Sequence, residues 1–283
     1  MMISLPGLAC VLRAVVLKDL QINYGTVDHA GLSISKYGFD VLLGGGQKQY
    51  SVTNVRGFEN DTFIFDQFHA HWGLNDTSGS EHRLAGKAYP LEFHLVHNNA
   101  KYATPFPDAQ GKIGGLVFIT VLFELGEANP EIDKILAAIK NGSDTVDSID
   151  LYGLIPKDMS TKFFGYDGSL SAPTCDENLL QHVARTIMTL SEEQMKTIRA
   201  FVGPEGEIIA PNYRHLQPLN GRKVYITEGV KEEVNLYCHR VCDGLSSCGD
   251  SKYGSYCKGS GVCYGLYHKD DGLLLPTYPV GGM

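Results

Sequence analysis

Two short stretches decide the fold: Phe65-Asp66-Gln67-Phe68-His69-Ala70-His71-Trp72-Gly73 and Leu91-Glu92-Phe93-His94-Leu95-Val96-His97. Both mix apolar and polar residues in the alternating way that is typical of half-buried β-strands. Successive side chains of a strand point to opposite faces, so one face of the first stretch carries Gln67, His69 and His71. One face of the second carries Glu92, His94 and Val96. If the two strands pair in one sheet, three imidazoles converge.

Three neutral imidazoles on rigid strands, with a fourth position left to water, form a typical catalytic zinc site. Zinc lowers the pKa of bound water from about 15.7 to about 7, which supplies hydroxide at neutral pH. Gln67 and Glu92 are candidate partners for the outer ring nitrogens of the ligand histidines. A His-x-His pair alone is a weak signal. The third histidine, with amide and carboxylate support, predicts a Zn²⁺ site at His69, His71 and His94.

A cupin-type iron site is the alternative that also begins with His-x-His. Such a site expects a glutamate about four residues further on, where this sequence has Asn75, so zinc is the predicted metal. Three imidazoles and one water complete the zinc shell. We therefore interpret four other histidines as structural or surface residues, namely His82, His97, His182 and His215.

Composition limits the kind of protein. The chain has 283 residues, of which 43% are hydrophobic, and its 15 Tyr and 12 Phe can fill a large core. A net charge of −8 argues against a general affinity for nucleic acid or anionic membranes. No apolar run approaches the roughly 18 residues of a transmembrane helix. We expect one folded domain with no transmembrane segment and no nucleic-acid partner.

Local patterns indicate a mainly β domain. Short alternating runs broken by glycines predict strands and hairpin turns between residues 15 and 55. An apolar, β-branched run over residues 116–123 predicts a buried strand. Asn129, followed by a proline and a glutamate, predicts a helix that continues to about Lys140. Ser191 and Gln194 form a capping box for a second helix that ends near Phe201.

The chain has seven cysteines, and five of them crowd into one stretch: Cys238, Cys242, Cys248, Cys257 and Cys263. This crowding indicates disulfides and an oxidising compartment. A second zinc site in this stretch is the alternative, although the stretch lacks a Cys-x-x-Cys pair. N-glycosylation sequons at Asn60, Asn75 and Asn141 agree with secretion. We expect a secreted glycoprotein whose cysteine-rich tail is a candidate contact for extracellular matrix partners.

Five stretches follow one another in a familiar order and spacing: residues 67–73, 79–82, 92–97, 166–173 and 212–222. Together they make the sequence similar to the α-class carbonic anhydrases over about residues 15 to 225. The resemblance implies a single domain with a large central, mostly antiparallel twisted β-sheet and a few peripheral helices. It also implies the reversible hydration of carbon dioxide to bicarbonate and a proton by zinc-bound hydroxide.

The resemblance assigns roles to individual residues. By this resemblance, the Ser171 hydroxyl accepts a hydrogen bond from the hydroxide and donates one to the Glu81 carboxylate, which orients the hydroxide. The backbone carbonyl of Asn212 orients the His71 ring, while Gln67 supports His69 and Glu92 supports His94. Ser171 stands where the family usually has threonine. Serine keeps the oxygen, although its rotamer is less restricted.

The substrate pocket departs from the family. Val96 and Leu170 match its apolar wall, but Phe118 stands where the family has a small aliphatic residue and Gln181 where it has a tryptophan. Ala172 replaces a second hydroxyl-bearing residue. Residues 37–39 (Tyr-Gly-Phe) lack the family's proton-shuttle histidine. The alternative function is therefore a zinc-binding but catalytically weak binding or matrix protein of the same family.

The resemblance also divides the chain. Residues 1–14 form a poorly matched N-terminus, residues 15–230 the carbonic-anhydrase-like domain, and residues 231–283 the cysteine-rich tail. The first eleven residues are apolar enough for a short signal segment but begin without positive charge, so a truncated or misassigned start is equally compatible. Secreted relatives pair a cysteine at the position of Cys175 with the N-terminal region, which implies a disulfide between Cys10 and Cys175.

Overall fold

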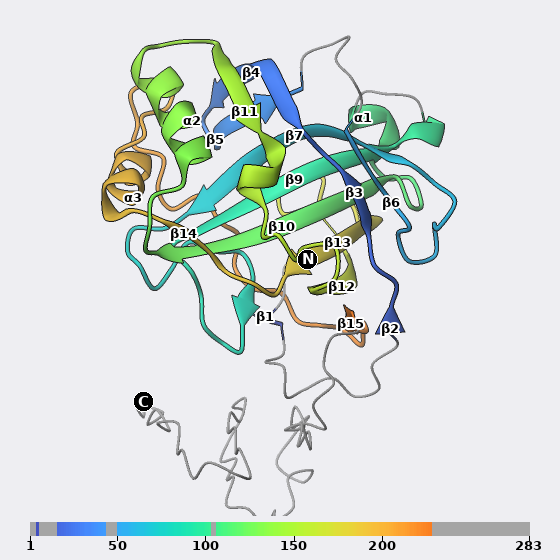
Figure 1. The fold of residues 1–283 in the computed structure, drawn as a ribbon. Helices are drawn as coiled ribbons and strands as arrows, with labels where there is room; N and C mark the ends of the chain where they lie inside the picture. Colours follow the sequence, from blue (N-terminus) through green and yellow to red (C-terminus); the bar gives the residue numbers. More distant parts are fainter. Residues whose placement is uncertain (1–3, 6–15, 44–49, 103–105, 228–283) are drawn as a thin grey trace, which may run out of the picture. The chain divides into compact units, whose positions relative to one another are not determined.

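A computed structural model of the chain describes residues 4–5, 16–43, 50–102 and 106–227. Thirteen of its strands form one large mixed sheet, which confirms the predicted mainly β fold (Figure 1). In the order of hydrogen-bonded neighbours, the main path runs through β11 (Thr145–Asp150), β4 (Thr26–Ser35), β5 (Gly38–Leu42), β7 (Phe63–Trp72), β9 (Leu91–Asn99), β10 (Leu116–Leu125), β13 (Leu179–Ala184), β12 (Phe163–Gly168), β15 (Tyr225–Thr227) and β2 (Val16–Leu17).

The remaining elements lie around this path. Three short strands pair at its sides, namely β3 (Gln21–Asn23), β6 (Ser51–Thr53) and β14 (Met188–Leu190). A separate two-stranded sheet contains β1 (Ser4–Leu5) and β8 (Arg83–Leu84). The helical segments are α1 (Phe106–Ala109), α2 (Pro130–Lys140), α3 (Glu192–Arg199) and the 3₁₀ turns Ala100–Tyr102 and Leu151–Leu154.

The two helices predicted from their caps form at the expected places. Asn129 caps α2 by accepting hydrogen bonds from the backbone N–H groups of Glu131 and Ile132. Ser191 and Gln194 form both halves of the capping box of α3. Gln194 has a second function that the sequence pattern does not reveal, because its Nε2 donates to the Asn129 carbonyl at 2.7 Å. One side chain therefore joins the starts of the two helices.

The register between β7 and β9 decides which side chains meet. The strands are antiparallel, and His69 lies directly opposite His94. Phe65 pairs with His97 but Gln67 pairs with Val96, so Asp66 is the extra residue of a β-bulge. The bulge shifts the alternation by one residue. Aromatic side chains before and after it therefore pack into the same core, while Gln67, His69 and His71 share the opposite face.

Both faces of the central strands are covered. Every residue of β9 is buried, as are the first eight of β10. The larger core contains the ring of Trp72, the rings of Phe93 and Phe123, and the apolar sides of α2 and α3. The opposite face carries a smaller apolar cluster built from Val96, Ala109, Leu116, Phe118, Leu170 and Leu179. The three histidines lie beside this smaller cluster.

Several predictions concern residues outside the described ranges. Cys10 and the cysteine-rich tail over residues 231–283 lie there, so the expected disulfides and the three domain boundaries stay predictions. Among the described residues, no helix is long and apolar enough to cross a membrane.

His97 is a buried titratable group on the core face of β9. Its Nε2 lies 2.7 Å from the Tyr24 hydroxyl and its Nδ1 lies 3.3 Å from the Val117 carbonyl oxygen. The ring stacks on Tyr24 with centroids 5.8 Å apart. A neutral ring satisfies both contacts, with Nδ1–H donating to the carbonyl and Nε2 accepting from the hydroxyl. Burial lowers the pKa of His97 from 6.5 to about 3.

This shift predicts an acid-dependent loss of stability. The unfolded chain takes up a proton at His97 near pH 6.5, whereas the folded chain does so only near pH 3. The stabilising term is complete above pH 6.5 and falls by about 1.4 kcal/mol per pH unit below it. Urea unfolding between pH 6 and 4 measures how steeply the free energy of unfolding depends on pH. In His97→Gln this slope should be smaller by the contribution of one proton, about 1.4 kcal/mol per pH unit. His215→Gln, at an exposed position, is the control, and equal slopes in both variants would refute the assignment.

Candidate metal centre

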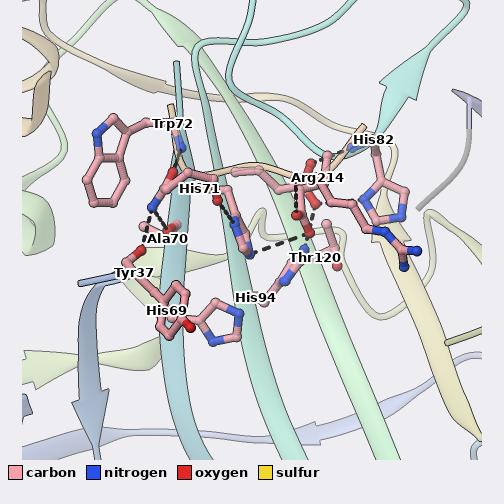
Figure 2. Close-up of polar contacts among 12 residues, drawn as sticks. Tyr37, His69, Ala70, His71, Trp72, His82, His94, Thr120 and Arg214 are labelled. Carbon is pink, nitrogen blue, oxygen red and sulfur yellow. Dashed lines mark hydrogen bonds and ion pairs between the residues drawn. The ribbon is translucent and has the colours of Figure 1, made fainter. Parts of the chain in front are cut away.

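Three histidine rings meet on one face of β7 and β9 (Figure 2). The ring centroids of His69 lie 5.2 Å from those of both His71 and His94, and the His71 and His94 centroids are 4.7 Å apart. One potential ligand nitrogen from each ring lies within 4.8 Å of the others. His94 is fully buried, and the other two are partly exposed. The structure thus brings the three predicted ligands together.

The nitrogens that face one another have no protein partner. His71 Nε2 and His94 Nδ1 are both buried without a hydrogen bond. The outer nitrogens are held by protein oxygens, in the pairs His69 Nδ1–Gln67 Oε1 at 3.1 Å, His71 Nδ1–Asn212 O at 2.9 Å and His94 Nε2–Glu92 Oε1 at 2.6 Å. In the neutral rings the outer nitrogen carries the proton, so each inner lone pair is available. This donor set fits a three-histidine zinc site.

Burial keeps the imidazoles of His69 and His94 neutral. It lowers the pKa of His69 well below the usual value, and the neighbouring His71 and His94 lower it further. Burial also lowers the pKa of His94, although the Glu92 carboxylate partly offsets the effect. A metal ion therefore meets unprotonated nitrogen at these two positions at neutral pH.

Glu92 has a second imidazole partner that sequence reasoning missed. Its Oε1 lies 2.6 Å from His82 Nδ1, and its Oε2 accepts the His82 backbone N–H at 2.8 Å. His82 Nε2 lies 2.6 Å from the Tyr166 hydroxyl. Burial alone would raise the pKa of Glu92, but the His82 and His94 rings outweigh burial and hold it well below its ordinary value. Both ring nitrogens of His82 are therefore hydrogen-bonded to protein groups. We interpret His82 as a support of the site and not as a fourth ligand.

A tight turn delivers Glu81 to the same space. Gly79 has φ of 144°, and a Cβ there would lie 2.1 Å from the Pro90 carbonyl oxygen, so only glycine fits. Glu81 is 1% exposed, and its Oε1 accepts the Arg214 backbone N–H at 2.8 Å. Its Oε2 has no hydrogen-bond partner and lies 3.5 Å from His71 Nε2. A carboxylate oxygen thus faces the unpaired imidazole nitrogens.

Ser171 does not complete the expected relay in this structure. Its hydroxyl makes no hydrogen bond to any described residue, and Glu81 Oε2 accepts none. The predicted Ser171–Glu81 hydrogen bond is therefore not formed. The loop that carries Ser171 is fixed by its backbone, since Leu170 N–H donates to the Asp176 carbonyl at 3.1 Å. The role of Ser171 stays a prediction.

Asn212 uses its side chain as well as its carbonyl. Its Oδ1 accepts the Trp72 backbone N–H at 2.7 Å, and its Nδ2 donates to the carbonyls of Ala70 and Tyr37 at 3.0 and 2.9 Å. Figure 2 shows these contacts beside His71. The sequence reading considered only the carbonyl. The amide locks residue 212 against β7, so that its carbonyl meets the His71 ring.

The expected apolar wall forms around Phe118. Its ring centroid lies 5.5 Å from that of His94 and 6.2 Å from that of His69. Phe118 is 2% exposed and belongs to the same cluster as Val96 and Leu170. A large ring therefore packs directly against two of the three candidate ligands. Ala172, in contrast, is exposed and lies outside this cluster.

Gln181, which the resemblance places in the substrate pocket, has its side-chain amide turned to a neighbouring strand. It pairs with Phe118 across the parallel strands β10 and β13, and it is fully buried. Its Oε1 accepts a hydrogen bond from the Thr120 hydroxyl at 2.9 Å. The polar group is thus engaged by a neighbouring strand, and the aromatic surface of this wall comes from Phe118.

Asp40 is a further acidic residue beside the ligands that sequence reasoning missed. It lies opposite His69 in the β5–β7 register, between the buried residues Phe39 and Val41. Burial raises the pKa of its carboxyl, although the nearby His71 acts in the opposite direction. The alternation of apolar Phe39, acidic Asp40 and apolar Val41 was the sequence signal that could have placed Asp40 on the same sheet face as the histidines. Tyr37, immediately before β5, is 66% exposed.

Cys175 forms no disulfide with a described residue. Its proposed partner Cys10 lies outside the described ranges, so the Cys10–Cys175 pairing stays a prediction.

A large β-sheet that carries three converging histidines is typical of a β protein with a metal-binding site. Comparison with known proteins identifies the family. The family model for eukaryotic-type carbonic anhydrase matches residues 11–228. Carbonic anhydrase 1 of Mus musculus is 33% identical over 218 residues, which cover 74% of this chain and 82% of that protein. Carbonic anhydrase 1 of Oryctolagus cuniculus is 34% identical over 175 residues, or 58% of this chain and 73% of that protein. The chain belongs to the eukaryotic-type, α-class carbonic anhydrase family.

The buried contacts of Glu92 predict a measurable effect on metal affinity. Glu92→Gln removes the charge that holds His82 and His94, so zinc affinity should fall by about 10- to 100-fold. Competition with a chelating dye measures this change. Glu124→Gln is the matched control, because Glu124 is only partly buried and its carboxylate pairs with Lys87 at 2.8 Å, away from the three histidines. Equal zinc affinity in both variants, with unchanged circular dichroism, would remove Glu92 from the site.

Proposed function

We propose that the protein is a zinc-dependent enzyme for the reversible hydration of carbon dioxide to bicarbonate and a proton. One observation carries the proposal: buried nitrogens of His71 and His94 and a buried oxygen of Glu81 face one space without hydrogen bonds. Family membership supports the class of reaction. His69, His71 and His94 are the proposed ligands.

The chemistry divides between the metal and the chain. Zinc held by three neutral imidazoles supplies a Lewis acid that makes water nucleophilic near neutral pH. Gln67, Glu92 and the Asn212 carbonyl keep the three rings in one tautomer and orientation. Glu81 offers a carboxylate oxygen as an acceptor, and we propose that the Ser171 hydroxyl donates a hydrogen bond to it during the reaction. Val96 and Leu170 provide an apolar surface for carbon dioxide, which has no charge to be recognised.

A second candidate function is a zinc-binding protein with weak turnover. The packing of Phe118 against His94 and His69 favours it, because the ring occupies apolar space beside the ligands. The two candidates share the metal and differ in whether substrate can reach it.

Stopped-flow hydration of carbon dioxide separates the two candidates. The protein is purified, its zinc content is determined, and His94→Ala serves as the blank. One zinc per chain with turnover that disappears in His94→Ala supports the enzyme. One zinc per chain with turnover equal to that of His94→Ala refutes the enzyme and leaves the zinc-binding protein.

Phe118 provides a second test within the same assay. Phe118→Val shortens the side chain that packs on two ligands, so kcat/KM for carbon dioxide should rise at least about tenfold, or roughly 1.4 kcal/mol in activation free energy. The variant must keep one zinc per chain, which excludes a change in metal binding. An unchanged kcat/KM would show that the ring does not obstruct the substrate.

We also propose an extracellular location. The support is the crowding of cysteines over residues 238–263 and the exposure of the three sequon asparagines, Asn60, Asn75 and Asn141. A contact between the tail and extracellular matrix partners is part of the same proposal. Mass spectrometry of protein secreted by eukaryotic cells, before and after reduction and glycosidase treatment, tests the location through its disulfides and glycans.

A further inference from the structure

A cavity lies away from the candidate metal centre, towards the β12–β15–β2 end of the sheet. Its volume is about 180 Å³. Three apolar side chains line it, namely Leu17, Leu20 and Phe163, and so do the polar side chains of Lys18, Arg56 and His182. It therefore combines an apolar surface with basic groups.

The sheet separates this cavity from the three histidines. Gln181 pairs with Phe118, whose ring packs on His69 and His94. His182 is the next residue along β13, so its side chain projects from the opposite face. His182 packs instead beside Phe163, with ring centroids 5.3 Å apart. The cavity is not an extension of the metal centre.

Arg56 is held in place at the cavity wall. Its Nη2 lies 2.6 Å from Asp167 Oδ1, and its guanidinium carbon lies 4.2 Å from the ring centroid of Tyr225. This ion pair uses one of the five N–H donors of the guanidinium. The fixed plane of the guanidinium suits recognition of a carboxylate. Lys18 adds a second cation, and it makes no ion pair or hydrogen bond with any described residue.

The lining offers two cationic groups, Lys18 and the remaining donors of Arg56, to a single carboxylate. Glu59 is the acidic residue of the lining, and its Oε1 accepts the Gly57 backbone N–H at 3.0 Å. That backbone hydrogen bond, with smaller effects of Lys18 and Arg56, keeps the pKa of Glu59 below its usual value. Asp167, which pairs with Arg56, is a second carboxylate beside the lining, so Lys18, Arg56, Glu59 and Asp167 together carry no net charge. A dianion would meet repulsion from Glu59 without a third cation to offset it.

His182 supplies an unsatisfied polar group at the inner side of the cavity. It is 3% exposed, and its Nδ1 is buried without a hydrogen-bond partner. Burial, with a smaller effect of the Arg56 charge, lowers the pKa of His182 to about 4, so the ring is neutral at pH 7. A neutral imidazole offers one donor and one acceptor nitrogen, and burying either without a partner is costly.

We propose that this cavity binds a small monocarboxylate with a short apolar or aromatic body. The carboxylate lies between Lys18 and Arg56, the body packs on Leu17, Leu20 and Phe163, and His182 makes a polar contact with the ligand. Nothing in this site depends on zinc or on carbon dioxide hydration. It is a ligand site beyond the proposed function.

Calorimetric titration of the full zinc-loaded chain with benzoate tests the proposal. Lys18→Gln and Arg56→Gln should each weaken benzoate binding at least about tenfold, or roughly 1.4 kcal/mol. Lys112→Gln should leave it unchanged, because Lys112 is exposed in the same way but lies outside the cavity. Binding should persist in His94→Ala, which separates this site from the metal centre and makes the result independent of any turnover.

Three outcomes would overturn the proposal. One is the absence of benzoate binding up to about 10 mM, a limit that corresponds to roughly −2.7 kcal/mol. Another is benzoate binding that disappears in His94→Ala, or that is as tight in Lys18→Gln and Arg56→Gln as in the unchanged protein. Either result would place benzoate elsewhere. The third is inorganic phosphate binding as tightly as benzoate with the same dependence on Lys18, because the apolar surface would then contribute nothing.

Discussion

The antiparallel register of β7 against β9 is the constraint on which the site depends. It places His69 directly opposite His94 and leaves His71 two residues away on the same face. The bulge at Asp66 is part of this arrangement, because a strand without it would send either its early aromatic residues or its histidines to the wrong face. One extra residue thus lets β7 fill the core and present His69 and His71 opposite His94 of β9.

A buried carboxylate is the second requirement. Glu92 is fully enclosed and would be costly to ionise without partners. His82 and His94 supply those partners, and Tyr166 closes the chain of hydrogen bonds at His82 Nε2. Breaking one member of such a buried network typically costs about 3–5 kcal/mol, because a charge is left without its partner. The same contacts therefore stabilise the centre of the sheet and orient the ring of His94, one of the three candidate ligands.

The apolar side of the site is where the sequence resemblance predicts a difference from the family. The two residues concerned are Phe118 and Gln181, which pair across β10 and β13. In the structure the aromatic ring packs on the ligands, and the amide is hydrogen-bonded to Thr120. The polar residue is thus accommodated without an unpaired amide oxygen in the apolar wall. Phe118 is therefore the large side chain that fills the apolar space beside His69 and His94.

The sequence by itself determined the mainly β fold, the caps of α2 and α3, and the set of three histidines. Each follows from local rules: alternation in strands, side-chain caps at helix starts, and the donor chemistry of zinc. Tertiary structure decided the contacts between residues far apart in the chain. The pairing of Glu92 with His82, the anchoring of Asn212 on β7, the position of Asp40 beside His69 and the bond between Gln181 and Thr120 each join different strands or loops. No local period encodes such contacts, because they exist only once the register of the sheet has been set.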